Sequence, residues 1–255
     1  MTTLKVHNPF NAPVYHKETV ASTMDVSRQL ALKGEMHGTV ISADFQEAGR
    51  GRIQGRIWQM DRKINLAFTV LLRYPNIEDI PPALTLRTGL AVSLAIEDFS
   101  ASLKGLVQVK WPNDIMINNK KTAGILCEAE NGNVHIGIGI NVAQKEFPSH
   151  LCKKATSIAA AASTQIMDED RFILLEKILM QLFNELHVIN KSNWKVRLEK
   201  RLYKKDEQVI FIEGQAGSKK EIAGCLLGIT DSGELLIKPK GESSARSFIT
   251  GELIL

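Results

Sequence analysis

The sequence predicts an α+β fold, with a large mixed domain followed by a small all-β module. Segments 83–105 and 168–190 carry apolar residues at helical spacing, which predicts two long amphipathic helices. Residues 106–143 read as consecutive strands. After Tyr203 the chain changes to short strands separated by Gly, Asp and Ser turns, so a domain boundary is expected there. The predicted domains are 1–202 and 203–255.

The first part of the large domain predicts one helix and two strands. Ser22 can cap a helix that carries Asp25 in its first turn and ends at Gly34. A β-branched run predicts a strand over 38–46. The mostly apolar segment 64–72 predicts a strand that is covered on both faces.

The second part predicts the two long helices and the turns of a sheet. The pair Pro81-Pro82 opens the first long helix, and Gly105 closes it. Asn118-Asn119 and Asn131-Gly132 supply turns between strands. The helix over 168–190 begins with acidic residues, which suit the positive end of a helix dipole.

Composition is that of an ordinary globular protein. The chain has 255 residues, of which 44% are hydrophobic and 24% charged, and its net charge is +4. This charge permits an anionic ligand without demanding nucleic acid. No run of about 18 apolar residues occurs, and the N-terminus lacks an apolar signal core, so no membrane span is expected. The three cysteines show neither metal nor disulfide spacing, which favours the cytoplasm.

The segment QEAGRGRIQGRIWQM (46–60) combines glycines, arginines and a tryptophan. It is too polar and too rich in glycine for a buried strand or a packed helix. One interpretation is a solvated basic loop. The other is a mobile loop that closes over an anionic ligand, because glycine lets backbone N–H groups approach a phosphate and arginine grips it through two parallel bonds. The segment alone leaves both open.

A second polar cluster follows a strand in the segment VKWPNDIMINNKKTAGILCEAE (109–130). Asn113 and Asp114 come just after the strand, where they could point into a cleft that Lys121 also faces, and Gly124 would allow a ligand to approach closely. The alternative is a hairpin in which the Asn and Asp only cap a turn, which is their commoner role.

Glycines at alternate strand positions mark the segment GIGIN (137–141). They remove side chains from one face of the strand. This leaves room for a planar group, or it allows a tightly packed strand pair.

Taken together and in order, these motifs resemble the biotin protein ligases. They are GRGR (49–52) with GRIW (55–58), KWPND (110–114), KKTAGIL (120–126) and GIGIN (137–141). The resemblance covers nearly the whole chain. It implies a class II synthetase-like catalytic domain, of the type shared with lipoate ligases, joined to an SH3-like C-terminal β-barrel. Because the catalytic domain would begin within the first 20 residues, it also implies the monofunctional form without an N-terminal DNA-binding domain.

The activity implied by the resemblance is a two-step ligation. ATP activates biotin to biotinyl-5′-AMP, and the biotinyl group then passes to one lysine of a biotin carboxyl carrier protein. The implied ligands are ATP, biotin and the Mg²⁺ that accompanies a triphosphate. The carrier domain is the expected partner; DNA and membrane are not expected, and a homodimer is one expected assembly because the family includes homodimers.

The resemblance also implies site residues. The biotin site comprises Ser22, Thr23, Gln46, Arg50, Gly51, Arg52, Lys121 and Gly124. The ATP site comprises Arg52, Arg56, Trp58, Asn113, Asp114 and Asn141. The implied catalytic residues are Lys121, Arg52 and Asp114, and no metal ligand is assigned.

Three departures from the family pattern bear on these assignments. The pair Ile53-Gln54 stands where the family has one residue, which affects where Arg56 and Trp58 lie. The segment QMDRKI (59–64) replaces the usual Ser-Pro-x-Gly. The GELIL segment keeps the Gly-Glu pair without the arginine that follows it in the family.

Two rival functions remain. One is a lipoate or octanoate ligase of the same fold, a class that generally lacks the GRGR and KWPND pair in this form. The other is a nonenzymatic nucleic-acid-binding module that uses the basic loop and the β-module. Aromatic residues make up only 6% of the chain and do not interleave with basic residues in the β-module, which disfavours nucleic acid.

Overall fold

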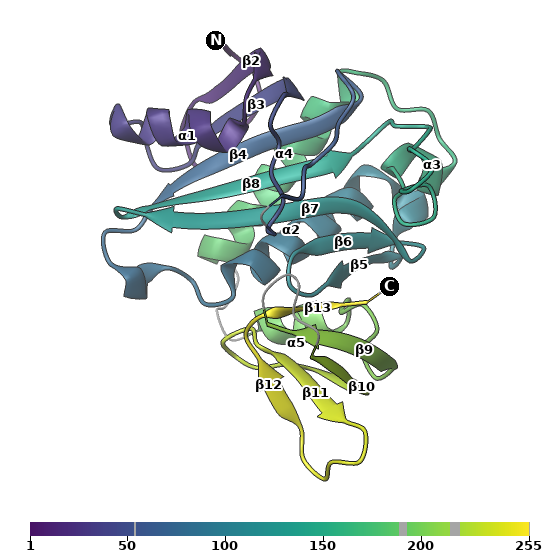
Figure 1. The fold of residues 1–255 in the computed structure, drawn as a ribbon. Coiled ribbons are helices and arrows are strands. Elements are labelled where there is room, and N and C mark those ends of the chain that lie inside the picture. The colour runs from purple at the N-terminus through teal and green to yellow at the C-terminus, as the bar shows by residue number, and fades with distance from the viewer. Residues whose placement is uncertain (54, 189–192, 215–219, 255) are drawn as a thin grey trace.

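The computed structural model describes residues 1–53, 55–188, 193–214 and 220–254. The larger of its two sheets has eight strands in the order β1-β2-β3-β4-β8-β7-β6-β5 (Figure 1). β2 and β3 pair in parallel, and the other neighbours pair antiparallel. The strands are β1 (Thr2–Thr3), β2 (Val14–Val20), β3 (Thr39–Gln46), β4 (Asn65–Arg73), β5 (Val107–Lys110), β6 (Asp114–Ile117), β7 (Lys120–Glu130) and β8 (Asn133–Asn141).

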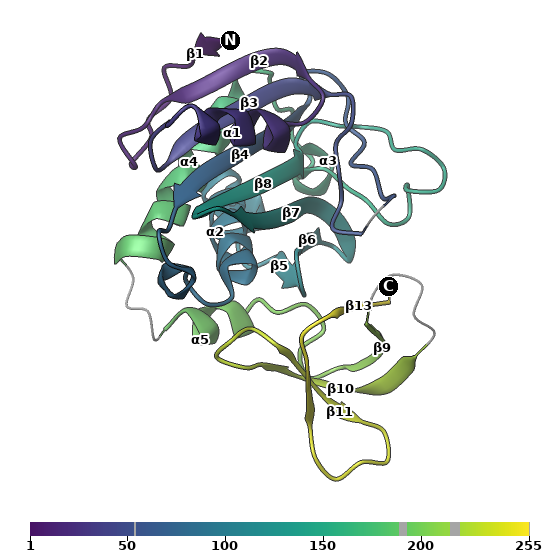
Figure 2. The same ribbon diagram turned by 60° about the vertical axis from the view of Figure 1, so that its left-hand side comes forward.

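Helices cover the large sheet on both faces (Figures 1 and 2). α2 (Leu84–Phe99) and α4 (Asp170–Phe183) pack against each other on one face, and α1 (Thr23–Leu32) packs on the other face against β3, β4 and β8. This cover confirms the prediction for β4, which is buried along its length up to its last residue. The shorter helices are η1 (Ile77–Asp79), η2 (Ala101–Leu103), α3 (Ile158–Ala162), η3 (Asn184–Val188) and α5 (Trp194–Glu199).

The predicted helix start and turns are confirmed. The Ser22 hydroxyl accepts a hydrogen bond from Met24 N at 3.2 Å and so caps α1. Gly34, just after the helix, has a φ of 82°, which glycine adopts without strain. Asn118-Asn119 and Asn131-Gly132 all have positive φ and connect β6 to β7 and β7 to β8.

The long helices differ from the prediction at their ends. α2 begins at Leu84 and stops at Phe99, because the backbone of Ser100 is extended; the short helix η2 fills the distance to Gly105. α4 passes at Asn184 into the π-helical turn η3. The predicted last residues of this helix, 189–190, lie outside the described residues. No helix within the described ranges is both long and apolar enough to cross a membrane.

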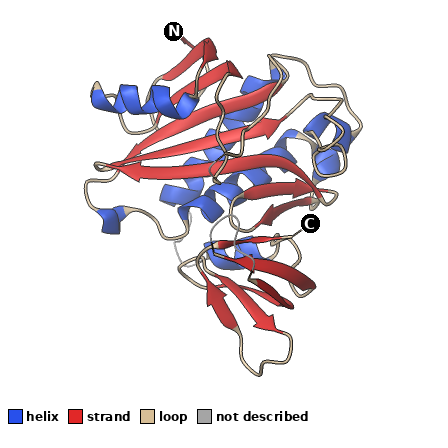
Figure 3. Cartoon of the chain, in the orientation of Figure 1, coloured by secondary structure: helices blue, strands red, loops and turns tan. Residues whose placement is uncertain are grey.

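The predicted all-β module is confirmed as a five-stranded antiparallel sheet, which stands apart from the large sheet in Figure 3. Among the described residues, no hydrogen-bonded pairing joins its outer strands β12 and β13. The predicted boundary near Tyr203 lies between α5 and β9, and the separation into two domains stays a prediction. The strands are β9 (Gln208–Glu213), β10 (Glu221–Ile229), β11 (Leu235–Pro239), β12 (Arg246–Phe248) and β13 (Gly251–Leu253).

The two sheets share one core. The Trp111 ring lies 5.9 Å from the Phe211 ring in β9, and its indole N–H donates to Gly233 O at 3.0 Å. Both aromatic residues belong to the same cluster of buried side chains as the apolar residues of the large sheet. The C-terminal sheet is therefore held beside the end of β5, where the KWPND motif lies.

Candidate active site

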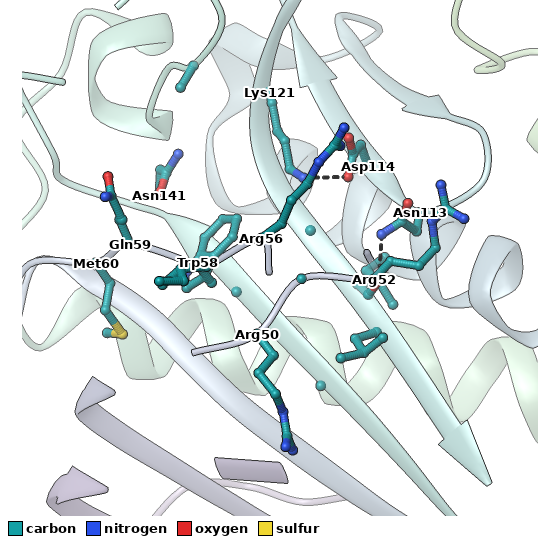
Figure 4. Close-up of a pocket in the computed structure, with 18 of the residues that line it drawn as sticks. Arg50, Arg52, Arg56, Trp58, Gln59, Met60, Asn113, Asp114, Lys121 and Asn141 are labelled. Carbon is teal, nitrogen blue, oxygen red and sulfur yellow. Dashed lines mark hydrogen bonds and ion pairs between the residues drawn. The ribbon is translucent and has the colours of Figure 1, made fainter. Parts of the chain in front are cut away.

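A cavity of about 870 Å³ lies beside the start of α1. Segments far apart in the sequence line it: the start of α1, the glycine- and arginine-rich loop, the β5–β6–β7 region, β8 and one residue of β13. The structure brings all of the predicted site residues together here (Figure 4). They are Ser22, Thr23, Gln46, Arg50, Gly51, Arg52, Arg56, Trp58, Asn113, Asp114, Lys121, Gly124 and Asn141.

One end of the cavity is polar and uncharged. The side-chain oxygen of Gln46, at the end of β3, accepts hydrogen bonds from Thr23 N at 2.8 Å and Thr23 Oγ1 at 3.0 Å. Thr69 Oγ1 donates to Thr23 Oγ1 at 2.9 Å from below. These bonds fix the Gln46 amide, and its NH₂ group has no acceptor among the described residues. This end can therefore donate hydrogen bonds to a neutral polar group.

An ion pair lies in the middle of the cavity. Lys121 Nζ is 2.6 Å from Asp114 Oδ1 (Figure 4). A register shift between Ile115 and Met116 aligns Lys121 with Met116 across the β6–β7 hairpin. Neighbouring Asn113 donates from its side chain to Ile125 O at 2.9 Å. The hairpin thus does more than cap a turn, because it presents a lysine and a carboxylate to the same cavity.

The glycine- and arginine-rich loop is a small hairpin across the cavity. Gly51 N donates to Arg56 O at 2.9 Å, and Trp58 N donates to Gly49 O at 2.9 Å. These bonds lie within the loop and give it a defined shape, and the loop lines the cavity, which fits the prediction of a ligand-facing loop better than that of a free solvated one. Of the pair Ile53-Gln54, which stands where the family has one residue, Gln54 lies outside the described residues.

The arginines of the loop have acceptors on both sides of the cavity. Arg50 Nη2 lies 2.7 Å from Asp25 Oδ1 in α1. Arg56 donates through both terminal nitrogens to the two carboxylate oxygens of Glu252, each at 2.9 Å. Arg52 Nη2 donates to Gly251 O at 2.9 Å.

The contact between the Arg56 guanidinium and the Glu252 carboxylate shifts the pKa of both groups. Hydrogen bonding to Arg56 lowers the pKa of the Glu252 carboxyl, and the same contact raises the pKa of Arg56. Both groups are therefore charged at neutral pH. The loop is thus tied by charge to β13 of the C-terminal sheet.

The alternate glycines of β8 make room for the protein's own side chains. A Cβ built at Gly139 would lie 2.5 Å from Cε2 of Trp58, and one built at Gly137 would lie 2.7 Å from Sδ of Met24. The planar group that the glycines accommodate is thus the Trp58 indole. Its Nε1 is buried without a hydrogen-bond partner in the described part of the chain, and Lys121 Nζ lies 5.9 Å from the ring centroid.

Sequence reasoning missed several residues that line the cavity. Lys110 and Glu252 belong to motifs that the sequence analysis quoted, KWPND and GELIL, so the signal was present. The segment 144–155 carries no comparable motif; Ser157 Oγ fixes it by donating to Gln144 O at 2.6 Å. Its lining residues are Gln144, Glu146, Phe147, Pro148, His150, Leu151 and Ala155.

Residues 17–144 match the biotin/lipoate A/B protein ligase family, over half of the chain. The chain belongs to this family. The bifunctional ligase/repressor BirA of Bacillus subtilis is 40% identical over 178 residues, which are 66% of this chain and 51% of that protein. BirA of Salmonella typhimurium is 30% identical over 254 residues, 92% of this chain and 73% of that protein. The chain thus spans about half the length of the first of these relatives.

A solved structure of a biotin protein ligase from Aquifex aeolicus, in complex with biotin and ATP, has the same fold. Its TM-score is 0.78 at 28% identity, and the match covers 94% of this chain and 97% of that one. The mixed fold that the sequence predicts is confirmed by this likeness. The roles of individual residues of this chain stay predictions.

Proposed function

We propose that the chain is an ATP-dependent biotin protein ligase. The observation that carries the proposal is one cavity that joins a neutral hydrogen-bonding end at Gln46 to a cationic end at Arg52 and Arg56, with Lys121 between the two ends. A ligand with a neutral polar head and a carboxylate, followed by a nucleotide, matches this order of groups. The Aquifex aeolicus ligase, whose structure holds biotin and ATP, supports the same reading.

In the first step a biotin carboxylate oxygen attacks the α-phosphorus of ATP. A phosphorus–oxygen bond forms, and the bond to the bridging oxygen breaks, so that pyrophosphate leaves with the electron pair. Two anions must meet, so positioning and positive charge supply most of the rate. Lys121 is a compact charge on a fixed strand and can contact both the carboxylate and the α-phosphate.

In the second step the amine of a carrier lysine attacks the acyl carbon, and AMP leaves. The amine loses a proton as the amide forms. Asp114 faces the same cavity, and in this proposal it orients Lys121 at 2.6 Å and helps to accept that proton. The loop over 49–58 shields the reactive acyl-adenylate from water, with Arg52 holding the phosphate.

Mg²⁺ would accompany the triphosphate. No group of three or more His, Cys, Asp or Glu side chains that could hold a metal ion occurs among the described residues. Among the described carboxylates that line the cavity, Asp114 and Glu252 already face Lys121 and Arg56, which leaves Asp61 and Glu146. This donor set fits an ion that is bound mainly by phosphates and water, where it would neutralise charge on the triphosphate.

The expected partner is a biotin carboxyl carrier domain, in the cytoplasm. The described cysteines Cys127, Cys152 and Cys225 are all free, which suits a reducing compartment. DNA and membranes have no part in this proposal, and a homodimer stays a prediction that gel filtration with light scattering would test.

Ligand preference distinguishes this proposal from a lipoate or octanoate ligase of the same fold. Calorimetry with biotin, lipoate and octanoate, each with and without a nonhydrolysable ATP analogue, tests the assignment. We expect biotin to bind, and to bind more tightly with the analogue present. Preference for lipoate or octanoate would assign the chain to the other branch of the family, and binding of nucleic acid without biotin would contradict a ligase altogether.

A further inference from the structure

Lys110, the last residue of β5, is a buried cation beside the cavity. It is 3% exposed and contributes to the cavity lining. Within the described part of the chain, its ammonium group has no hydrogen bond and no ion pair within 4.0 Å. Lysine is rarely buried without a counter-charge, because removing an ammonium group from water is costly. A ligand that brings negative charge into the cavity would resolve this imbalance.

The nearby carboxylates are already engaged by other cations. Asp114 pairs with Lys121 at 2.6 Å, and Glu252 accepts both arms of Arg56. Burial lowers the pKa of Lys110; Asp114 and Glu252 raise it to a smaller extent, while Lys121 and Arg56 lower it further. Within the described part of the chain these four groups act electrostatically on Lys110, and together with it they leave an excess of positive charge.

Sheet order places Lys110 at the opposite end of the cavity from Gln46. Gln46 ends β3 and Lys110 ends β5, and β4, β8, β7 and β6 lie between them. At about 4.8 Å between strands, these five steps span roughly 24 Å. Lys121 on β7 is two steps, or about 10 Å, from Lys110. Lys110 therefore lies beyond Lys121 when the cavity is followed from its neutral end.

This order identifies the part of the nucleotide that reaches Lys110. In the proposed function the α-phosphate meets the biotin carboxylate at Lys121. Two branches leave the α-phosphate: the adenosine, which is neutral, and the β- and γ-phosphates, which are anionic. A buried ammonium group without a counter-ion suits only the anionic branch.

We propose that Lys110 binds the β- and γ-phosphates of ATP and the pyrophosphate that they become. The inference rests on the proposed function. As the bond between the α-phosphorus and the bridging oxygen breaks, negative charge builds up on the leaving pyrophosphate, and the ammonium group of Lys110 stabilises it. Pyrophosphate in turn supplies the counter-charge that the described residues do not give Lys110.

Lys110→Met tests this assignment, because methionine keeps the length and removes the charge. We expect the Kd for inorganic pyrophosphate and for ATP to rise about 10- to 100-fold, as for loss of a hydrogen bond to a charged group. The Kd for biotin should stay unchanged. The Tm of the ligand-free protein should stay unchanged or rise, because an unpaired buried charge is removed.

Two variants serve as controls. Lys104→Met removes an exposed lysine ahead of the same strand and should change neither Kd nor Tm. Lys110→Arg keeps the charge and should recover part of the pyrophosphate affinity. Calorimetry with pyrophosphate, ATP and biotin, beside thermal unfolding, gives each value.

Three other results in Lys110→Met would overturn the assignment. Unchanged pyrophosphate and ATP affinity in Lys110→Met would remove Lys110 from the phosphate site. A lower Tm, or an equal loss of biotin and pyrophosphate affinity, would show that Lys110 supports the fold instead. If the wild-type protein bound ATP and pyrophosphate but not biotin, the proposed function would fail while the role of Lys110 stood.

Discussion

Replacing Lys121 by alanine removes the cation that faces both reacting anions. Its Nζ is 2.6 Å from Asp114 Oδ1, at the junction of the neutral and cationic ends of the cavity. Removing one fixed donor from a developing oxyanion typically slows a reaction about 10²- to 10³-fold, or about 2.7–4 kcal/mol. We expect a loss of this size in biotin-dependent exchange between ATP and pyrophosphate.

Biotin binding should suffer much less in Lys121→Ala. The neutral end at Thr23 and Gln46 does not touch the substituted side chain, and its hydrogen bonds remain. Fold stability should fall by about 1 kcal/mol or less, because the ion pair with Asp114 is partly exposed. The variant should therefore fold, bind biotin and fail in adenylate formation.

Lys120→Ala is the matched control for this experiment. Lys120 is the preceding residue of β7, but it does not line the cavity, and its Nζ donates to Cys152 O at 3.1 Å. Exchange should stay near the wild-type rate in this variant. Near-normal exchange in Lys121→Ala, or an equal loss in both variants, would refute the catalytic role of Lys121.

Three other predictions concern the loop, the strand beneath it and the response to acid. Arg52→Gly should still form the adenylate but leak it, seen as labelling of bystander lysines; retention as tight as in the wild type would contradict loop closure. Gly139→Ala should push the Trp58 indole off β8 and lower the free energy of unfolding by about 1–3 kcal/mol. The displaced indole should give red-shifted fluorescence, and the signal can be assigned to Trp58 because the other two tryptophans are buried. Burial lowers the pKa of His37 and His135 below 6.5, so the unfolded chain binds more protons and stability should fall as pH falls below about 6.5. Urea unfolding at pH values above and below 6.5 measures this change, and a free energy of unfolding that does not vary with pH would contradict the prediction.

The parts of the fold that depend on local chemistry could be predicted from the sequence. The Ser22 cap and the Asn131-Gly132 turn act within a few residues, and the structure has them where the pattern indicates. The end of α2 could not be placed, because apolar residues continue past Ser100, whose extended backbone ends the helix. Helix ends are therefore the elements that pattern alone locates least well.

The cavity shows the same difference between what local sequence predicts and what depends on tertiary packing. Motif order identified many of the residues that line it, but neither the 144–155 segment nor the partners of the lining residues. Arg56 and Glu252 are far apart in the sequence and meet only because the shared core at Trp111 holds the C-terminal sheet beside β5. The Trp58 indole fills the space above Gly139, a contact that alternate glycines indicate only as an open position.

The central claim is that this cavity makes and transfers a biotinyl group. The most direct measurement is mass spectrometry of a purified biotin carboxyl carrier domain after incubation with the protein, biotin and ATP. The account predicts a mass increase of one biotinyl group on a single carrier lysine, which requires both small molecules and is lost in Lys121→Ala. An unmodified carrier, or equal modification when lipoate replaces biotin, would contradict it.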